Sequence, residues 1–343
     1  MNKRSISLIF LIVALLFTSC SAKVEKDTLD KASGEAIFHF IDVGQGDCIL
    51  IQSEDKNILI DAGTSQSGST IYRYLNNLKI DYLDYFIGTH PHEDHLGGAA
   101  TVLSSINVGT VFINGDSSSS FFYEKFIDTL IKKDITAEIP DTSCIYEIGP
   151  FRITFLSPLK DFGNANDNSL VFTVEFGEIK ALFTGDAERS VEAELLKDKR
   201  AIDADILKVG HHGSRYASSS AFLNAVSPSV SVIQCGEGNS YGHPHTEALE
   251  RLDGISGAVL RTDTEGNIIL KTDGETLKKT SGEEFEPVDQ ATNLEVIYIG
   301  NKKSRIFHSE ACPNLPSDKN RKDFISREEA LNSGYKSCGN CNP

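Results

Sequence analysis

A dense group of potential metal ligands lies at residues 89–98, in the string Thr-His-Pro-His-Glu-Asp-His-Leu-Gly-Gly. Successive side chains of an extended chain point to opposite faces, so His90, His92 and Asp94 would face one side. His95 would join them only if the chain turns, and the glycine pair that follows permits a turn and the start of a helix. Imidazole nitrogens with a carboxylate suit zinc, manganese or iron better than calcium or magnesium. The string therefore predicts a transition-metal site.

Two other strand-like segments also end in potential ligands. Asp186 follows the apolar residues 179–183 through a glycine, and a carboxylate there can bridge two cations and offset their repulsion. The alternative role for Asp186 is to cap the next helix. His211 and His212 end the apolar residues 204–209. We expect His211 to face the metal ions, and His212 to point to substrate or to support the ligands from behind.

A further candidate is the loop that contains His243, Pro244 and His245. Pro244 can begin a helix, which would place both imidazoles near a helix N-terminus, where anions bind. We expect His243 to bind substrate or to transfer a proton; the alternative is a purely structural hydrogen bond. Weaker candidates are Tyr241, Ser214 and Lys208. The last of these is expected in or beside a sheet, in a structural role.

Short apolar segments that recur between residues 36 and 271 must position these ligands. They alternate with turns and with segments of helical spacing, so we expect sheets covered by helices in an αββα arrangement. The strand candidates are residues 36–43, 48–52, 57–60, 83–88, 108–113, 151–156, 170–176, 179–183, 204–209, 230–234, 258–261 and 267–271. The helix candidates are residues 71–78, 122–130, 187–196, 221–226 and 245–252.

The His-x-His-x-Asp-His string resembles the first motif of the metallo-beta-lactamase fold hydrolases, and the resemblance extends through most of residues 36–271. The other motifs that carry it are Asp42-Val43-Gly44-Gln45-Gly46-Asp47, Asp61-Ala62-Gly63, Asn166-Asp167-Asn168-Ser169-Leu170-Val171, Phe183-Thr184-Gly185-Asp186, Leu207-Lys208-Val209-Gly210-His211-His212-Gly213-Ser214 and Tyr241-Gly242-His243-Pro244-His245. In this order they are similar to the signatures of the ComEC-like branch. The resemblance implies an α/β fold, an αββα metallo-beta-lactamase sandwich with a two-metal site at its edge.

One position departs from the family pattern. The third ligand of the first metal is usually a histidine, whereas this chain has Asn166-Asp167-Asn168-Ser169, and amides bind zinc poorly. Asp167 completes the first site, or the first metal is held more weakly, or a substrate phosphate supplies the missing coordination. The ComEC-like pattern has a similar Asn-rich motif, so the change indicates a difference between branches and not an inactive enzyme.

Together, spacing and resemblance imply a catalytic site with two zinc ions, for which manganese is the alternative. Its expected ligands are His90, His92, Asp94, His95, Asp167, Asp186 and His211. Such ions supply a hydroxide near neutral pH. Asp94 or Asp186 would orient this nucleophile, and His243 or His212 would stabilise the oxyanion or protonate the leaving oxygen.

These residues predict a metal-dependent hydrolase, most plausibly a phosphodiesterase or nuclease with DNA, RNA or nucleotides as its substrate. The alternatives are hydrolysis of an uncharged ester, amide or lactone, and a non-catalytic nucleic-acid-binding receptor. The sequence contains no P-loop, which argues against NTP-driven chemistry. Its 33 Lys and Arg against 49 Asp and Glu, a net charge of -16, argue against a diffuse basic surface for nucleic acid. A polyanionic substrate would need a local positive centre.

The first 22 residues have the layout of a signal peptide. Lys3 and Arg4 precede an apolar segment, and small residues surround Cys20. The layout resembles the bacterial lipoprotein signal, which implies a lipid anchor on Cys20 and a place on the extracytoplasmic side of the cell membrane. The alternatives are an ordinary secretory signal and an uncleaved membrane helix. Removal of residues 1–19 changes the net charge to 31 minus 49, or -18.

The chain ends in a second potential metal site. His308-x3-Cys312 and Cys338-x2-Cys341 form the two close ligand pairs of a closed structural zinc site; the alternative is a disulfide between Cys338 and Cys341. Residues 298–343 resemble the zinc-binding domain of the Ada DNA-repair protein. There the first ligand is a methyl-accepting cysteine, so His308 argues against methyl transfer. The basic residues that would contact DNA by this analogy, or form a solvated face, are Arg305, Lys319, Arg321 and Lys322.

The expected division of the chain follows from these motifs and from a polar stretch near residue 280. It consists of a lipoprotein signal at 1–19, a tether at 20–34, the hydrolase domain at 35–275, a linker at 276–293 and a small zinc-binding α+β module at 294–343. Cys48, Cys144 and Cys235 lie singly in apolar or strand-like surroundings, and we expect them to be buried apolar side chains. The sequence indicates no protein partner.

Overall fold

The computed structural model describes residues 34–280, 284–285, 298–309, 312–324 and 327–341. The expected lipoprotein signal, Cys20 and nearly all of the tether lie outside the described residues. Residues 286–293, the last part of the expected linker, also lie outside the described residues. Within the described ranges, no helix has both the length and the apolar character needed to cross a membrane.

Nine strands form the first sheet, in the order β16-β15-β14-β1-β2-β3-β4-β5-β6. Their bounds are β1 Ala36–Phe40, β2 Ile49–Ser53, β3 Lys56–Ile60, β4 Tyr82–Gly88, β5 Asn107–Ile113, β6 Ala137–Glu138, β14 Ile268–Thr272, β15 Leu277–Lys279 and β16 Glu284–Phe285. β3, β4 and β5 are parallel to one another. Their carboxyl ends therefore lie at one edge of the sheet.

Seven strands form the second sheet, in the order β13-β12-β11-β10-β9-β8-β7. Their bounds are β7 Ile145–Ile148, β8 Phe151–Ser157, β9 Val171–Phe176, β10 Ile179–Phe183, β11 Ile206–Lys208, β12 Val230–Ile233 and β13 Ala258–Arg261. β10 to β13 are parallel, so the second sheet also gathers several carboxyl ends at one edge.

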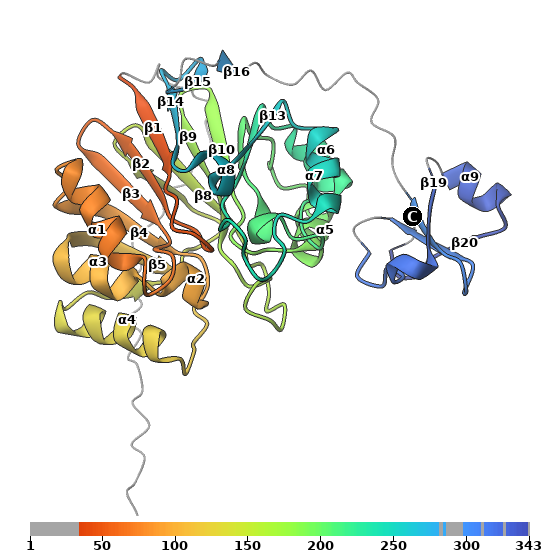
Figure 1. Ribbon diagram of the computed structural model, residues 1–343, viewed down its shortest axis with the longest axis horizontal. Coiled ribbons are helices and arrows are strands. Elements are labelled where there is room, and N and C mark those ends of the chain that lie inside the picture. The colour runs from red at the N-terminus through yellow and green to blue at the C-terminus, as the bar shows by residue number, and fades with distance from the viewer. Residues whose placement is uncertain (1–33, 281–283, 286–297, 310–311, 325–326, 342–343) are drawn as a thin grey trace, which may run out of the picture.

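The two sheets pack face to face, and helices cover the outer face of each (Figure 1). α1 Gly68–Asn77, α3 Ala99–Ser105 and α4 Phe121–Lys132 lie on the first sheet, and α5 Arg189–Lys197, α6 Ser220–Val226 and α7 Thr246–Asp253 lie on the second. Two short helices, α2 Glu93–Leu96 and α8 Thr262–Glu265, lie in loops. This arrangement confirms the predicted αββα sandwich.

Alternating apolar residues of both sheets build the layer between them. Phenylalanine rings dominate it: the ring centroids of Phe155 and Phe172 are 5.2 Å apart, and those of Phe172 and Phe183 are 5.3 Å apart. Such rings fill an interior densely and in defined orientations. This packing fixes the two sheets against each other and so fixes the strand ends that carry the candidate ligands.

The structure differs from the sequence expectations at the margins of the sheets. β15 and β16 lie inside the expected linker 276–293, because edge strands with one solvated face need few apolar residues. β6 and β7, the edge strands at the other side, were also not predicted. Cys48 and Cys235 are buried as expected, but Cys144 is only half-buried, because it lies in the turn before β7.

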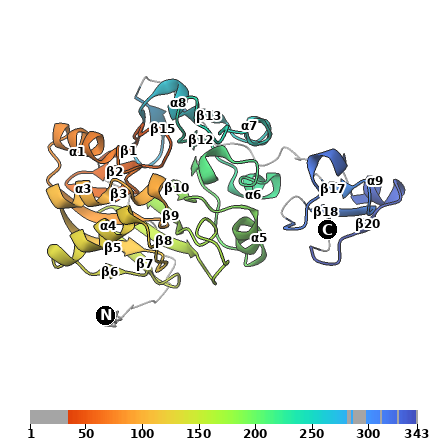
Figure 2. The same ribbon diagram turned by 60° about the horizontal axis from the view of Figure 1, so that its bottom comes forward.

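Four short strands near the end of the chain form a third sheet, in the order β19-β17-β18-β20, with one helix beside it (Figure 2). The bounds are β17 Tyr298–Asn301, β18 Ile306–Ser309, β19 Arg321–Phe324, α9 Arg327–Asn332 and β20 Lys336–Ser337, with a 3-10 turn at Asp318–Asn320. Phe307, Phe324, Ala330 and Tyr335 form its core. This core is small, so the module depends on other contacts for stability.

Candidate metal centre

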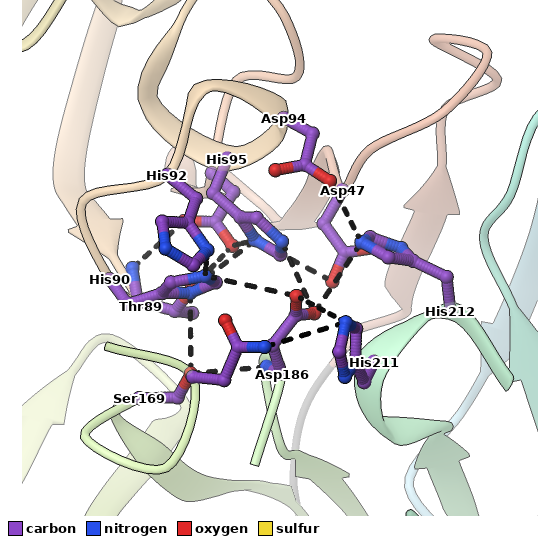
Figure 3. Close-up of polar contacts among 12 residues, drawn as sticks. Asp47, Thr89, His90, His92, Asp94, His95, Ser169, Asp186, His211 and His212 are labelled. Atoms are coloured by element: carbon purple, nitrogen blue, oxygen red, sulfur yellow. Dashed lines mark hydrogen bonds and ion pairs between the residues drawn. The ribbon is translucent and has the colours of Figure 1, made fainter. Parts of the chain in front are cut away.

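Most of the predicted ligands meet where strands of both sheets end (Figure 3). His90 follows β4 of the first sheet, whereas Asp186 follows β10 and His211 follows β11 of the second. Ligand sites in α/β folds commonly lie outside the carboxyl ends of parallel strands. Here two such edges face each other, so side chains from both layers converge on one site. We call this site the pit; it is formed by His90, His92, Asp94, His95, Asp186, His211 and His212.

The turn that brings His95 to the pit is α2. It starts at Glu93, earlier than the glycine pair suggested, and the backbone N–H of Ala62 donates to the carbonyl of His95 at 2.7 Å. The N–H of Asp47 donates to the carbonyl of Asp94 at 3.0 Å. Gly98 makes this fold possible, because a β-carbon there would collide with the backbone of Ala62.

Asp186 lies at the centre of the pit, with imidazoles on both sides of its carboxylate. Its Oδ1 is 3.2 Å from Nε2 of His95 and 3.5 Å from Nε2 of His212. Its Oδ2 is 3.8 Å from Nε2 of His90 and 3.7 Å from Nε2 of His211. Each carboxylate oxygen therefore faces its own set of histidines, which is the geometry expected of a ligand shared between two cations.

His92 and Asp94 complete the two sets. Nδ1 of His92 is 3.0 Å from Nε2 of His90, on the Oδ2 side of Asp186. Oδ2 of Asp94 is 3.2 Å from Nε2 of His212, on the Oδ1 side. The alternation of the first motif thus divides its residues between the two sides and does not place them all on one face.

The backbone explains why both His211 and His212 reach Asp186. Both residues have positive φ angles, of 46° and 53°, in the left-handed region that non-glycine residues rarely adopt. Two such residues in succession turn the chain sharply and send one ring to each side of Asp186. We expected only His211 to face the ions, but the structure also buries His212 in the pit, with 1% of its surface exposed.

Several buried atoms in the pit have no hydrogen-bond partner among the residues that the structure describes. They are Nε2 of His95, Nε2 of His212 and Oδ1 of Asp186, which face one another. A buried polar atom without a partner costs about 1–3 kcal/mol, so three together indicate a ligand that all of them bind. Imidazole nitrogens and a carboxylate oxygen within 4.8 Å of one another suit a divalent transition metal. The residues present therefore fit a metal ion.

Asp61 positions His95 from behind. Its Oδ2 is 2.8 Å from Nδ1 of His95 and accepts the hydroxyl of Thr89 at 2.8 Å, and its Oδ1 accepts the N–H of Thr89 at 2.8 Å. With Nδ1 directed to Asp61, Nε2 is the ring nitrogen that a cation in the pit would bind. Burial alone would lower the pKa of His95, but Asp186 and Asp61 outweigh it and raise that pKa well above its usual value. The pit therefore attracts cations.

A buried ion pair supports His212 in a similar way. Nδ1 of His212 is 2.9 Å from the carbonyl of Gln234 and 3.2 Å from Oδ1 of Asp47. Nζ of Lys208 is 2.7 Å from Oδ2 of Asp47, and both side chains are 1% exposed. Burial would raise the pKa of Asp47, but Lys208 and His212 hold it below its usual value. Lys208 thus lies in the sheet, as expected. It also supports the pit indirectly, because it contacts Asp47, which contacts His212.

The structure does not bring Asp167 to the other predicted ligands. Its Oδ1 accepts the backbone N–H of Glu188 at 3.0 Å, and its Oδ2 accepts the hydroxyl of Ser190 at 2.5 Å. A carboxylate at a helix start is stabilised by the free N–H groups there, which explains this position at the start of α5. The side chain next to His211 is instead Asn166, with Nδ2 3.4 Å from its Nε2. These contacts do not support Asp167 as the third ligand.

The ring of His243 lies beside the rings of His211 and His212. Its ring centroid is 5.4 Å from that of His211 and 6.2 Å from that of His212. Burial, together with the neighbouring imidazoles, lowers the pKa of His243 to about 4. A neutral imidazole can donate one hydrogen bond, but it holds no extra proton to give away at neutral pH. His245 caps the start of α7, as the position of Pro244 indicated.

The second predicted site is assembled near the end of the chain. His308 on β18, Cys312 after it, and Cys338 and Cys341 after β20 each have a ligand atom within 4.8 Å of the others. Nδ1 of His308 is 3.2 Å from Sγ of Cys312. Cys338 and Cys341 are free thiols, so the disulfide alternative is wrong for this structure. The donor set, three thiols and one imidazole, suits a structural metal ion.

The sequence profile of the "Metallo-beta-lactamase superfamily" matches residues 41–237, which is more than half of the chain. The chain belongs to this superfamily. Its members are hydrolases with metal sites, in agreement with the donor atoms in the pit.

Comparison with curated proteins adds the branch. The chain is 31% identical over 255 residues to "ComE operon protein 3" of Bacillus subtilis, which covers 69% of this chain and 33% of that protein. This similarity confirms the ComEC-like branch. The chain is also 23% identical over 194 residues to "Endoribonuclease ysh-1" of Neurospora crassa, covering 49% of this chain and 23% of that protein. The chain thus matches at most about a third of the length of these relatives.

Among solved structures, the chain is similar to the "metallo-beta-lactamase fold protein YhfI" from Bacillus subtilis, at a TM-score of 0.48 and 13% identity, over 70% of this chain and all of that chain.

Sequence reasoning did not assign site roles to several residues that surround the ligands. Asp47 and Asp61 stand in the motifs quoted for the resemblance, and this was the available signal for both. Glu188, whose Oε1 is 2.7 Å from Nδ1 of His211, and Gln234 gave no such signal, because their roles depend on contacts between distant strands.

Proposed function

We propose that this chain is a metal-dependent phosphodiesterase that acts on nucleic acid or nucleotides, with two zinc or manganese ions on either side of Asp186. The observation that carries the proposal is the division of the histidines between the two oxygens of that one carboxylate. A shared carboxylate with separate ligand sets is the arrangement that two adjacent dications require, because it offsets their mutual repulsion.

The two sites draw on different residues. His90, His92, His211 and Asp186 would hold the first ion, and Asp94, His95, His212 and Asp186 would hold the second. Related enzymes usually have a histidine ligand in the motif that reads Asn166-Asp167-Asn168-Ser169 here. In this assignment, His211 replaces that histidine as a ligand of the first ion. It is supported by Glu188, which accepts from Nδ1 of His211 and leaves Nε2 toward the pit. Asp167 then has a purely structural role at the start of α5.

The chain's own residues prepare the site for hydrolysis. When bound, the two ions supply a nucleophilic hydroxide near neutral pH and screen the charge of the phosphodiester. Asp61, Asp47 and the carbonyl of Gln234 each hold a histidine in the tautomer that binds metal. Asp94, 25% exposed at the mouth of the pit, orients the attacking water. Neutral His243 donates a hydrogen bond to the developing oxyanion and does not act as the general acid.

Nucleic acid is the favoured substrate class for two reasons. One of the related proteins carries the name of an endoribonuclease. A phosphodiester also needs the local positive charge that two dications provide, because the chain as a whole has a net charge of -16.

The test is a comparison of metal content and turnover in the form that starts at Ser21. Zinc and manganese are supplied separately, and the substrates are bis(p-nitrophenyl) phosphate, single- and double-stranded DNA, RNA, a cyclic dinucleotide and a lactone. We expect phosphodiester turnover that Asp186→Asn abolishes and that the surface variant Asp128→Asn on α4 retains. Two bound metal ions with no turnover of any phosphodiester would contradict the proposal, and turnover of the lactone alone would replace it with an esterase.

We also propose the remaining organisation of the chain. A lipid on Cys20 would hold the hydrolase on the outer side of the cell membrane, and zinc bound by His308 and the three nearby cysteines would stabilise the C-terminal module. Metabolic labelling with a palmitate analogue tests the anchor. We expect label on the full-length chain and none on Cys20→Ser, and equal labelling of both would refute it.

A further inference from the structure

An exposed tyrosine stands beside the pit on a loop between β12 and α7. The ring of Tyr241 is 63% exposed and lies nearly parallel to the ring of His243, at an interplanar angle of 21° and a centroid distance of 5.8 Å. His243 in turn contacts the ring of His211 at 5.4 Å. A continuous series of rings therefore leads from the ligands of Asp186 to solvent.

The loop that carries Tyr241 is held by one asparagine. Oδ1 of Asn239 accepts the backbone N–H of Tyr241 at 3.2 Å and that of His243 at 3.0 Å. Its Nδ2 donates to the carbonyls of Gly236 at 2.9 Å and His243 at 2.5 Å. These four hydrogen bonds fix the backbone on both sides of Tyr241. Its ring is thus held in an exposed position, and the ordering cost of that position is already met by folding.

His243, beside this ring, has a polar atom whose hydrogen-bonding capacity is not used. Its Nδ1 is buried and has no hydrogen-bond partner within the described part of the chain. The exposed ring of Tyr241 can stack against a planar group, and the polar atom of His243 can hydrogen-bond a second group of the same ligand. A nucleotide has both parts, because its base is planar and its phosphate accepts hydrogen bonds.

We propose that Tyr241, backed by His243, is a stacking platform for the nucleobase next to the scissile phosphodiester, a subsite that rests on the proposed phosphodiesterase function. Stacking on an aromatic ring does not depend on charge, so it gives this acidic protein a hold on nucleic acid that basic residues do not provide. It also sets the substrate class. An unpaired base can stack on the platform at once, whereas a base in a duplex must first leave its own stack. Single strands are therefore the preferred substrates.

The test compares two fluorescent single-stranded oligonucleotides, one with its bases and one with abasic residues at every internal position. Both are measured for affinity by anisotropy and for KM and kcat, with wild type, Tyr241→Ala, Tyr241→Phe and the control Tyr72→Ala on the exposed face of α1. We expect Tyr241→Ala to weaken binding and raise KM about 10-fold for the base-bearing strand, with little change in kcat. Tyr241→Phe and Tyr72→Ala should stay within about twofold of wild type, because both keep the platform ring.

The abasic strand separates this proposal from the one on which it depends. Wild type should bind it about 10-fold more weakly than the base-bearing strand, and Tyr241→Ala should bind the two alike. Equal affinity of wild type for both strands, or no binding of either, would overturn the platform. An intact preference for bases with no cleavage of either strand would support the platform and overturn only the proposed hydrolysis.

Discussion

The buried pair of Lys208 and Asp47 allows a quantitative test of how the pit is supported. At 2.7 Å and an effective dielectric constant of about 20, their attraction is about 6 kcal/mol, and burial of the two charges costs several kcal/mol per ion. The intact pair is thus close to neutral in its effect on stability. Lys208→Met leaves the carboxylate of Asp47 buried without its closest cation, and we expect this to destabilise the protein by about 3–5 kcal/mol.

The assay is urea unfolding of zinc-saturated protein, in which a metal-bound His212 is neutral and does not replace the missing cation. With an m-value of about 3 kcal/mol/M, the midpoint of Lys208→Met should fall by about 1 to 1.7 M. The double variant Lys208→Met with Asp47→Asn removes both charges, so it should recover most of this loss. The coupling between the two sites is then the measure of the pair.

Two outcomes would refute this reasoning. A midpoint for Lys208→Met within about 0.2 M of wild type would mean that the neighbouring histidines, His212 and His95, satisfy Asp47 without Lys208. Additive losses in the double variant would mean that Lys208 acts by its packing and not by its charge.

Three further predictions concern other contacts. Asp61→Asn should weaken metal binding by about 10- to 100-fold in a chelator competition, because His95 loses its positioning carboxylate; unchanged affinity would contradict this. Cys338→Ser should remove one zinc per chain by elemental analysis while phosphodiester turnover persists, and loss of turnover would show that the two sites are coupled. Burial lowers the pKa of His39 from 6.5 to about 4, so folding favours the neutral ring and stability falls as the pH drops below 6.5, by about 2 kcal/mol at pH 5. His39→Gln should lose less stability between pH 7.5 and 5 by urea midpoint, and an equal loss would refute the role of His39.

Local pattern was sufficient for the parts of the fold that bury apolar side chains. The strands that lead to His90, Asp186 and His211 are short apolar runs ending in a glycine or a polar residue, and each was predicted within a few residues of its observed bounds. β15 and β16 were missed, because their polar sequence becomes a strand only by pairing with β14. Propensity carries no information about such a partner.

The site shows the same limit at the level of single side chains. The first motif could be predicted, because three histidines and an aspartate within six residues have few uses other than binding metal, and Asp186 could be predicted from its position just after an apolar strand. The two directions taken by His211 and His212 could not, because they follow from left-handed backbone angles set by the surrounding packing. Asp167 was misleading for a related reason: a carboxylate suits a cation and a helix start equally well, and only the position of α5 decides between them.

The origin of the ligands in two separate sheets has a mechanical consequence. The ring packing between the sheets already sets their alignment, and it places His95 from one layer beside His212 from the other, with ring centroids 5.2 Å apart. A bound ion with ligands from both layers would join the two sheets a second time, at the edge where their strands end. Activity would then report on the alignment of the two halves, and a substitution far from the pit that shifts one layer by about 1 Å could silence the enzyme without unfolding it.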